Sequence, residues 1–237
     1  ASGDRIFVLG NGPGGQVYGS TAMPLEVFRY DPVADRHEDL GGMPGGEVYS
    51  MIEQQGKLYL CYYGGAVMNL YDPDKPFWKF GTDEDSNPIS FGGVGDGHLR
   101  PRAMIRGPGG RIYIGSEPPY GQLGGALGVW DPQQNKTVEN YRHLVPDQSI
   151  VSLAWEEQSG LVFGGSGNFG GGGTRPAAQE AKFFAFDPKL KKKVYQTSLV
   201  EGARSYPATV AAEGKVYTTA GDRLFVFDPQ DKKVVAE

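Results

Sequence analysis

Short apolar runs separated by turn residues recur along the whole chain. They typically read glycine, a basic residue, then apolar, aromatic and apolar residues, with spacings of 52, 54, 50 and 54 between their aromatic residues Phe7, Tyr59, Tyr113, Phe163 and Tyr217. Residues 6–9, 58–60 and 112–114 are continuously apolar, which indicates strands buried on both faces. Turn residues follow too closely for helices of average length. The pattern therefore predicts an all-β protein.

An aromatic residue followed by Asp-Pro ends one strand in each repeat. The five pairs are Asp31-Pro32, Asp72-Pro73, Asp131-Pro132, Asp187-Pro188 and Asp228-Pro229. Proline cannot donate into a β-ladder, and an aspartate side chain accepts hydrogen bonds from the backbone just ahead, so the pair ends a strand and starts a turn. We expect these aspartates to be structural rather than metal ligands.

Strand-rich repeats of roughly 40 to 50 residues are typical of β-propellers. We therefore predict one propeller domain over residues 1–237, with about five four-stranded antiparallel blades. The predicted repeats span residues 1–47, 48–100, 101–147, 148–204 and 205–237. In the second repeat the four strands are expected at residues 48–54, 57–63, 67–71 and 77–80.

The first repeat starts directly at the strand that carries Phe7, so we predict a first blade without its inner strand. Either five blades close with this incomplete blade, or the chain is part of a larger ring. We favour the larger ring, because closure normally leaves no open edges. The first and last blades should then expose apolar faces that missing blades or a second copy cover.

The predicted loops are unevenly distributed. The gap from each apolar-run aromatic to the following Asp varies between 11 and 24 residues, and one further long connection is expected at residues 81–101. By alternation of strand direction, these variable connections emerge on one face of a propeller. Irregular loops on a rigid scaffold are where binding usually occurs, so this face is the predicted site.

The segment 26–32, followed by residues 40–44, resembles a kelch repeat. Trp78 lies six residues after Asp72, as in kelch repeats, and glycine doublets occur at 64–65 and 164–165. The chain is also similar to bacterial YVTN and quinoprotein-like propellers, whereas it lacks the WD40 pattern. These resemblances imply blades rather than a particular chemistry. The copper site of kelch-class oxidases needs tyrosine, histidine and a cross-linked cysteine, which three histidines and one cysteine do not fit, so we expect no cofactor and no metal.

The amino-acid composition and charge argue against some classes of binding partner. The chain has 37 glycines and 17 prolines but remains 39% hydrophobic, which is typical of a turn-rich β protein. A net charge of −5 argues against nucleic acid, and no apolar run approaches the ~20 residues that cross a membrane. The single cysteine, Cys61, excludes an internal disulfide and is expected to be buried. No signal peptide is visible at Ala1, where cleavage could have removed one, and we expect an extracellular or periplasmic location.

Arginines mark the candidate site on the loop-rich face. Arg100 and Arg204 each precede a strand aromatic by 13 residues, so they should occupy equivalent positions at the mouth of the central channel. Together with Glu47 and Arg102 they are the predicted ligand-binding residues. Arginine binds carboxylates through two parallel hydrogen bonds, so we predict a small or polymeric glycan, or another polar or anionic ligand. Alternatively, the arginines pair with Glu47, Asp96 or Asp147 and only close the channel.

Two other functions stay open. A polysaccharide lyase acting on uronate polymers would use an arginine to neutralise the substrate carboxylate, and His98, Tyr120 or Tyr206 as base and acid. Tyr120, which follows two prolines, could also stack on a sugar ring. Residues 164–173 are glycine-rich but lack the context of a phosphate-binding loop, and we expect a flexible or glycine-packed loop. A protein-interaction scaffold is the third possibility, although long polar loops favour small or polymeric ligands.

Overall fold

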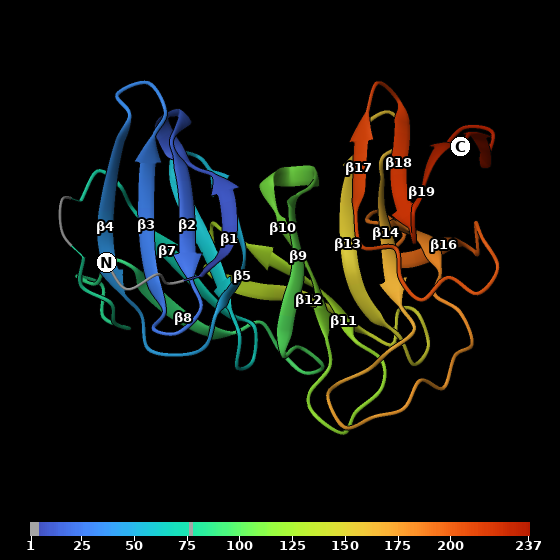
Figure 1. The fold of residues 1–237 in the computed structure, drawn as a ribbon, viewed down its shortest axis with the longest axis horizontal. Helices are drawn as coiled ribbons and strands as arrows, with labels where there is room; N and C mark the ends of the chain where they lie inside the picture. The colour runs from blue at the N-terminus through green and yellow to red at the C-terminus, as the bar shows by residue number, and fades with distance from the viewer. Residues whose placement is uncertain (1–4, 76–77) are drawn as a thin grey trace. The chain divides into compact units, whose positions relative to one another are not determined.

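The computed structural model describes residues 5–75 and 78–237, and these form five four-stranded antiparallel sheets (Figure 1). In unit 1, residues 1–94, the first sheet holds β1 (Ile6–Asn11), β2 (Val17–Thr21), β3 (Glu26–Asp31) and β4 (Arg36–Gly42). The second sheet holds β5 (Val48–Gln54), β6 (Lys57–Tyr62), β7 (Val67–Tyr71) and β8 (Ile89–Gly93). Within each sheet, strands that follow one another in sequence are neighbours.

Unit 2, residues 95–237, holds the other three sheets. The third sheet comprises β9 (Arg100–Arg106), β10 (Ile112–Glu117), β11 (Ala126–Asp131) and β12 (Lys136–Arg142). The fourth comprises β13 (Ser149–Glu156), β14 (Leu161–Gly167), β15 (Phe183–Asp187) and β16 (Lys192–Thr197), and the fifth β17 (Thr209–Ala212), β18 (Lys215–Ala220), β19 (Arg223–Asp228) and β20 (Lys233–Ala236). The all-β prediction is confirmed, whereas closure of the sheets into one propeller domain stays a prediction.

The first sheet is complete, so the predicted absence of its inner strand is wrong. The apolar run at residues 6–9 is the inner strand β1 itself, and Phe7 is 39% exposed. The residue equivalent to Tyr113 is Tyr18 on β2, because each follows a Gly-Pro-Gly-Gly turn with the same conformation. The first glycine of each turn is required by close packing: a Cβ on Gly12 would lie 2.1 Å from the Tyr18 ring.

The outer strand of the second sheet also differs from the prediction of 77–80. Phe77 lies outside the described residues, and residues 78–80 contribute only an isolated bridge between Lys79 and Asn87. Strand β8 forms the outer strand instead. The extra length of this repeat therefore lies between β7 and β8, and not in the connection from outer to inner strand that was expected at residues 81–101.

Consecutive sheets within each unit pack face to face through the aromatic residue of the second strand. Tyr113 is 2% exposed and shares a cluster with Ile150 and Phe184 of the fourth sheet. Phe163 of the fourth sheet packs in turn with residues of the fifth sheet that include Phe225. The predicted burial is confirmed for Tyr59 and Tyr113. Phe163 is buried as well, whereas Tyr217 in the fifth sheet is only half-buried.

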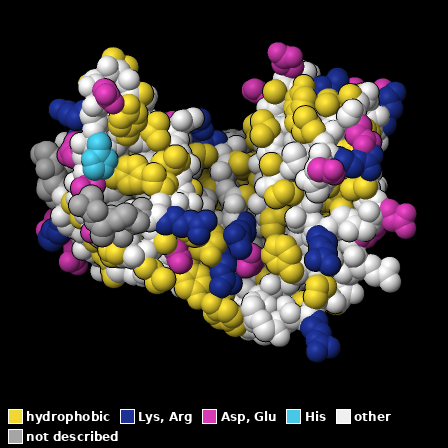
Figure 2. Space-filling view, in the orientation of Figure 1, with side chains coloured by type: hydrophobic (Ala, Val, Ile, Leu, Met, Phe, Trp, Pro, Cys, Tyr) yellow, Lys and Arg dark blue, Asp and Glu magenta, His cyan; other side chains and the backbone are white. Residues whose placement is uncertain are grey.

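The first and fifth sheets expose apolar side chains, as expected. Of twelve exposed large hydrophobic residues among those described, nine belong to these two repeats: Ile6, Phe7, Leu9, Met23, Val33, Val210, Leu224, Val234 and Val235. Figure 2 shows hydrophobic side chains over the parts of the surface where β1 and β17–β18 lie in Figure 1. On the fifth sheet Val210 pairs with Tyr217, which pairs with Val226 across the next strand, so one cross-strand row of this face is apolar.

The Asp-Pro turns have the predicted structural role. In all five, the aspartate Oδ1 accepts a hydrogen bond from the backbone N–H two residues ahead, at 2.8–3.1 Å. Cys61 is buried as expected, and burial raises the pKa of its thiol.

Candidate ligand-binding site

Two β-bulges direct side chains from the inner strands of unit 2 into one cavity. Arg102 is the extra residue where the register between β9 and β10 shifts, and Val151 is the extra residue at the corresponding shift between β13 and β14. A bulge re-aims the extra side chain away from the ladder. Arg102 and Val151 line a cavity of about 300 Å³ together with Phe169, Ser205 and Pro207.

A larger cavity of about 840 Å³ shares Phe169 and Ser205 with the smaller one. Its other lining residues are Asn168, Pro176, Ala178, Gln179, Gly202 and Arg204. We call the two together the unit 2 cleft. Both volumes lie at a scale typical of ligand pockets, about 300–1,000 Å³.

A buried carboxylate holds two of the predicted arginines. Glu117 is 4% exposed, and its Oε1 accepts a hydrogen bond from Arg102 Nε at 2.5 Å. Arg100 Nη1 lies 3.4 Å from the other carboxylate oxygen, while Arg100 Nη2 donates to the Tyr120 hydroxyl at 2.9 Å. The sequence suggested pairing with Asp96, but Asp96 accepts from Arg142. Two guanidinium groups therefore share the Glu117 carboxylate.

Arg204 supplies the positive charge of the larger cavity. It lies on the exposed connection between β16 and β17, where its carbonyl accepts a hydrogen bond from Asn168 N at 2.9 Å. Among the residues that the structure describes, no acidic side chain pairs with its guanidinium. Figure 2 shows basic side chains gathered around the part of unit 2 where β9 begins in Figure 1.

The glycine-rich loop of the fourth sheet packs directly on the Tyr120 loop of the third. Gly121 N donates to Gly172 O at 3.0 Å, and Gly171 N donates to Gln122 O at 2.9 Å. A Cβ on Gly171 would lie only 1.9 Å from Pro119 O, so the backbones approach more closely than any side chain permits. The expectation of a glycine-packed loop is confirmed. Phe169, from the same glycine-rich loop, lines the cleft, and Tyr120 is 56% exposed.

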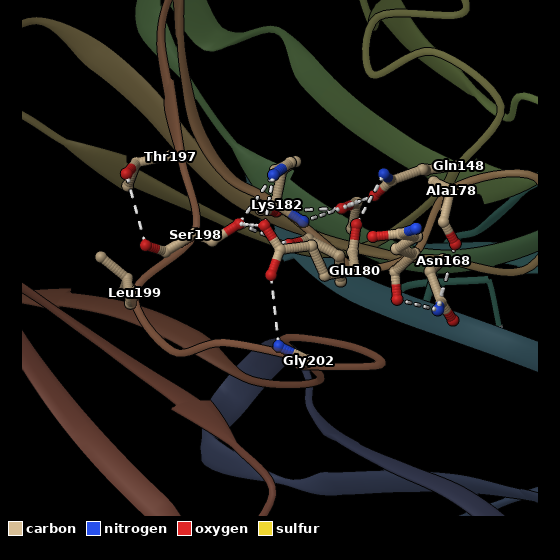
Figure 3. Close-up of polar contacts among 12 residues, drawn as sticks. Gln148, Asn168, Ala178, Glu180, Lys182, Thr197, Ser198, Leu199 and Gly202 are labelled. Atoms are coloured by element: carbon tan, nitrogen blue, oxygen red, sulfur yellow. Dashed lines mark hydrogen bonds and ion pairs between the residues drawn. The ribbon is translucent and has the colours of Figure 1, made fainter.

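A polar network centred on Glu180 includes Asn168 and Gly202, which line the larger cavity (Figure 3). The Glu180 carboxylate accepts hydrogen bonds from Lys182 Nζ at 2.8 Å, Ser198 Oγ at 2.5 Å and Gly202 N at 3.2 Å. These three donors lower the pKa of Glu180 to about 2. Asn168 Nδ2 adds bonds to the carbonyls of residues 178 and 179. These hydrogen bonds connect the loop before β15 to the segment that carries Arg204.

His98 and Tyr206, two of the three candidate catalytic residues, are buried and make hydrogen bonds within the protein interior. His98 is 3% exposed, its Nδ1 lies 2.6 Å from Ser116 Oγ, and burial lowers its pKa to about 4. Gln148 at the equivalent position of the next repeat binds Ser166 in the same way, at 2.5 Å. The buried Tyr206 hydroxyl accepts a hydrogen bond from Leu199 N.

The structure thus brings together Arg100, Arg102 and Tyr120 through Glu117, and places Arg204 across the shared wall of the cleft. Glu47 belongs to unit 1, and its role as a ligand-binding residue stays a prediction. Phe169, Asn168 and Glu180 were missed by the sequence analysis. Among the described residues, no group of three or more His, Cys, Asp or Glu side chains could hold a metal ion, and no helix has the length and apolarity to span a membrane.

Two solved structures are similar to this chain in fold. The first is described as the extracellular domain of a one-component system, BT4673 from B. thetaiotaomicron, with a TM-score of 0.67 at 17% identity over 99% of this chain and 28% of that one. The second is described as the extracellular domain of the hybrid two-component system BT4673, with a TM-score of 0.63 at 17% identity over 92% of this chain and 25% of that one. The chain thus spans about a quarter of these structures. No family model and no curated protein matches the chain.

Proposed function

We propose that this chain is a ligand-binding β-propeller module, and that the unit 2 cleft binds an anionic glycan. The observation that carries the proposal is Arg204, a guanidinium that lines a cavity of about 840 Å³ without an acidic partner among the described residues. Guanidinium groups match carboxylate geometry, and such charge-assisted hydrogen bonds are about twice as strong as neutral ones. The aromatic side chains of Phe169 and Tyr120 beside the cleft suit the apolar faces of sugar rings.

The similar structures fit this proposal. Both are extracellular domains of systems described as one-component or hybrid two-component. A ligand-binding role outside the cell is the simplest function for such a fold with a cationic cleft, and we propose it for this chain.

A lyase acting on uronate polymers is the alternative that the arginines also suit. It needs an accessible base and acid near the bound carboxylate. Burial removes the side chains of His98 and Tyr206 from that role, which leaves Tyr120 with its hydroxyl bonded to Arg100. A single exposed hydroxyl supports binding better than elimination chemistry.

Replacing Arg204 by alanine is expected to weaken binding of trigalacturonate tenfold to a hundredfold, since a hydrogen bond to a charged group contributes about 1.5–3 kcal/mol. Binding of the neutral trisaccharide galactotriose should change much less. Isothermal titration calorimetry on the intact chain measures both. The matched control is Arg36→Ala, which removes an exposed arginine of the first sheet. Equal losses for the two sugars, or no binding of either by the unmodified chain, would contradict the proposal.

The apolar faces of the first and fifth sheets support a second element of the proposal, namely that further sheets of the same kind cover them. Within unit 2, Tyr113 and Phe163 face the following sheet, and Tyr217 presents the same face without such a cover.

Replacing Leu224, which is 50% exposed, by lysine should reduce self-association of this chain and leave its folding intact. Light scattering over a concentration series measures the effect, with Leu190→Lys as the control; an unchanged association would argue against an apolar contact at this face.

A further inference from the structure

A third cavity of unit 2 lies at the opposite ends of the strands from the cleft. Arg102 stands near the start of β9, whereas this cavity is lined by the turn that follows the end of β9 and by Arg111 and Tyr113. From the fourth sheet it is lined by Pro188 and Lys189, which follow the end of β15. Its volume of about 400 Å³ is typical of ligand pockets. We call it the Arg111 pocket.

Unit 1 contains an equivalent cavity of about 330 Å³. It is lined by the other Gly-Pro-Gly-Gly turn, by Tyr18 and by the Asp-Pro turn of the second sheet, so corresponding positions of the repeat build both pockets. Two of these positions differ in charge. Gln16 stands where the second pocket has Arg111, and Asp74 stands where it has Lys189. The repeat therefore provides the cavity, and two substitutions give the unit 2 copy its basic side chains.

Lys189 brings a free positive charge to the Arg111 pocket. In the described part of the chain its exposed side chain makes no ion pair with an acidic residue. Asp131 also lines the pocket, but both of its oxygens bind donors of its own turn: Oδ1 accepts from Gln133 N at 2.9 Å, and Oδ2 accepts from Gln134 Nε2 at 2.8 Å. The Asp131 carboxylate is therefore not the partner of Lys189.

Arg111 is only loosely paired. Its Nη1 lies 3.5 Å from Glu139 Oε1, whereas Lys191 Nζ lies 2.7 Å from the same oxygen. A guanidinium has further N–H donors, and within the described residues those of Arg111 have no other acceptor. The pocket and its immediate partners together carry a net charge of +1, from the basic residues Arg111, Lys189 and Lys191 and the acidic residues Asp131 and Glu139.

Two basic side chains from different sheets suit a tetrahedral oxyanion. A phosphate or sulfate ester has three terminal oxygens that point in different directions, so one such group can accept hydrogen bonds from Arg111 and Lys189 together. A carboxylate has two coplanar oxygens, which suit a single guanidinium. Pro108 and Pro188 add apolar surface, and the Gln133 side chain adds an amide, for the organic part of the ligand.

We propose that the Arg111 pocket binds a phosphate or sulfate ester of a small polar molecule, held between Arg111 and Lys189. This site is separate from the unit 2 cleft and does not depend on the function proposed for the cleft. The equivalent pocket of unit 1 does not bind such a ligand, because Gln16 and Asp74 replace the two basic residues.

Titration of the intact, isotope-labelled chain with glucose 6-phosphate, followed by NMR, tests this site. Saturable shifts are expected at the backbone amides of residues 109–113 and 189–190, with one site per chain. Glucose 6-sulfate is the second probe, which distinguishes phosphate from sulfate esters, and glucose is the neutral control. Lys189→Asp and Arg111→Gln, which install the residues of the unit 1 pocket, should each weaken binding about tenfold or more, because a hydrogen bond to a charged group is lost.

Lys232→Asp is the matched control, since it makes the same change of charge at an exposed position of the fifth sheet. It should change the affinity by less than about twofold, because salt screens distant exposed charges. Ester binding that persists in both pocket variants, or that is lost in Arg204→Ala instead, would overturn the proposal, and the second result would assign the anion to the cleft. The absence of shifts with either ester would overturn this site and leave the function proposed for the cleft standing.

Discussion

Replacing Tyr113 by alanine is expected to lower the free energy of unfolding by about 3–5 kcal/mol, the range for truncating a buried aromatic side chain. The Tyr113 ring is buried within a cluster that includes Leu127 of its own sheet and Ile150 and Phe186 of the next. Two sheets meet at this ring, so neither can move to fill the space without losing contacts elsewhere. Urea denaturation followed by circular dichroism measures the change.

Two matched variants test the packing scheme behind this value. Tyr113→Phe should cost about 1 kcal/mol or less, because Phe163 occupies the equivalent position of the next repeat. Phe7→Ala should also cost about 1 kcal/mol or less, since Phe7 is 39% exposed and its main aromatic contact is with Tyr49. If Phe7→Ala were as costly as Tyr113→Ala, the alignment of repeats made from the sequence would be right after all.

The repeat could be predicted from the sequence because its turns are local. An aspartate that accepts a backbone hydrogen bond two residues ahead needs nothing from the rest of the molecule, and all five such turns formed as expected. The first repeat was misaligned because an apolar run does not say which strand of a sheet it forms. The correct alignment of the first repeat with the third is indicated by two identical Gly-Pro-Gly-Gly turns, at residues 12–15 and 107–110.

The site was less predictable because it depends on pairing between strands. The spacing of Arg100 and Arg204 predicted equivalent positions for the two arginines, but it gave no sign of the register shift at Arg102, which lines the cleft. Phe169 was missed because its position depends on the contact between two loops, which composition alone does not reveal. Closeness in sequence to the arginines also suggested His98 and Tyr206, whose side chains are buried instead.

The pH dependence of stability should reveal the buried role of His98. Burial lowers the pKa of His98 from 6.5 to about 4, so between these values the unfolded chain binds a proton that the folded chain does not. Stability therefore rises with pH across this window: the contribution is fully present above about pH 6.5 and is lost as the pH falls towards 4. The expected loss is about 3 kcal/mol, which urea denaturation at a series of pH values measures.

The matched variant is His98→Gln, which is expected to remove this dependence with little loss of stability at pH 7. Gln148 already makes the contact with serine in the next repeat, because its Oε1 accepts from Ser166 Oγ, and the glutamine amide can also donate to Asn140 Oδ1, which lies 3.1 Å from His98 Nε2. Titration of Glu180, whose pKa is lowered to about 2, is common to both proteins and cancels in the comparison. The variant should bind trigalacturonate as the original chain does, because His98 lines neither cavity. Identical pH profiles for the two proteins would show that His98 is not held neutral in the interior. If the variant lost uronate binding but kept its stability, His98 would instead belong to the functional site.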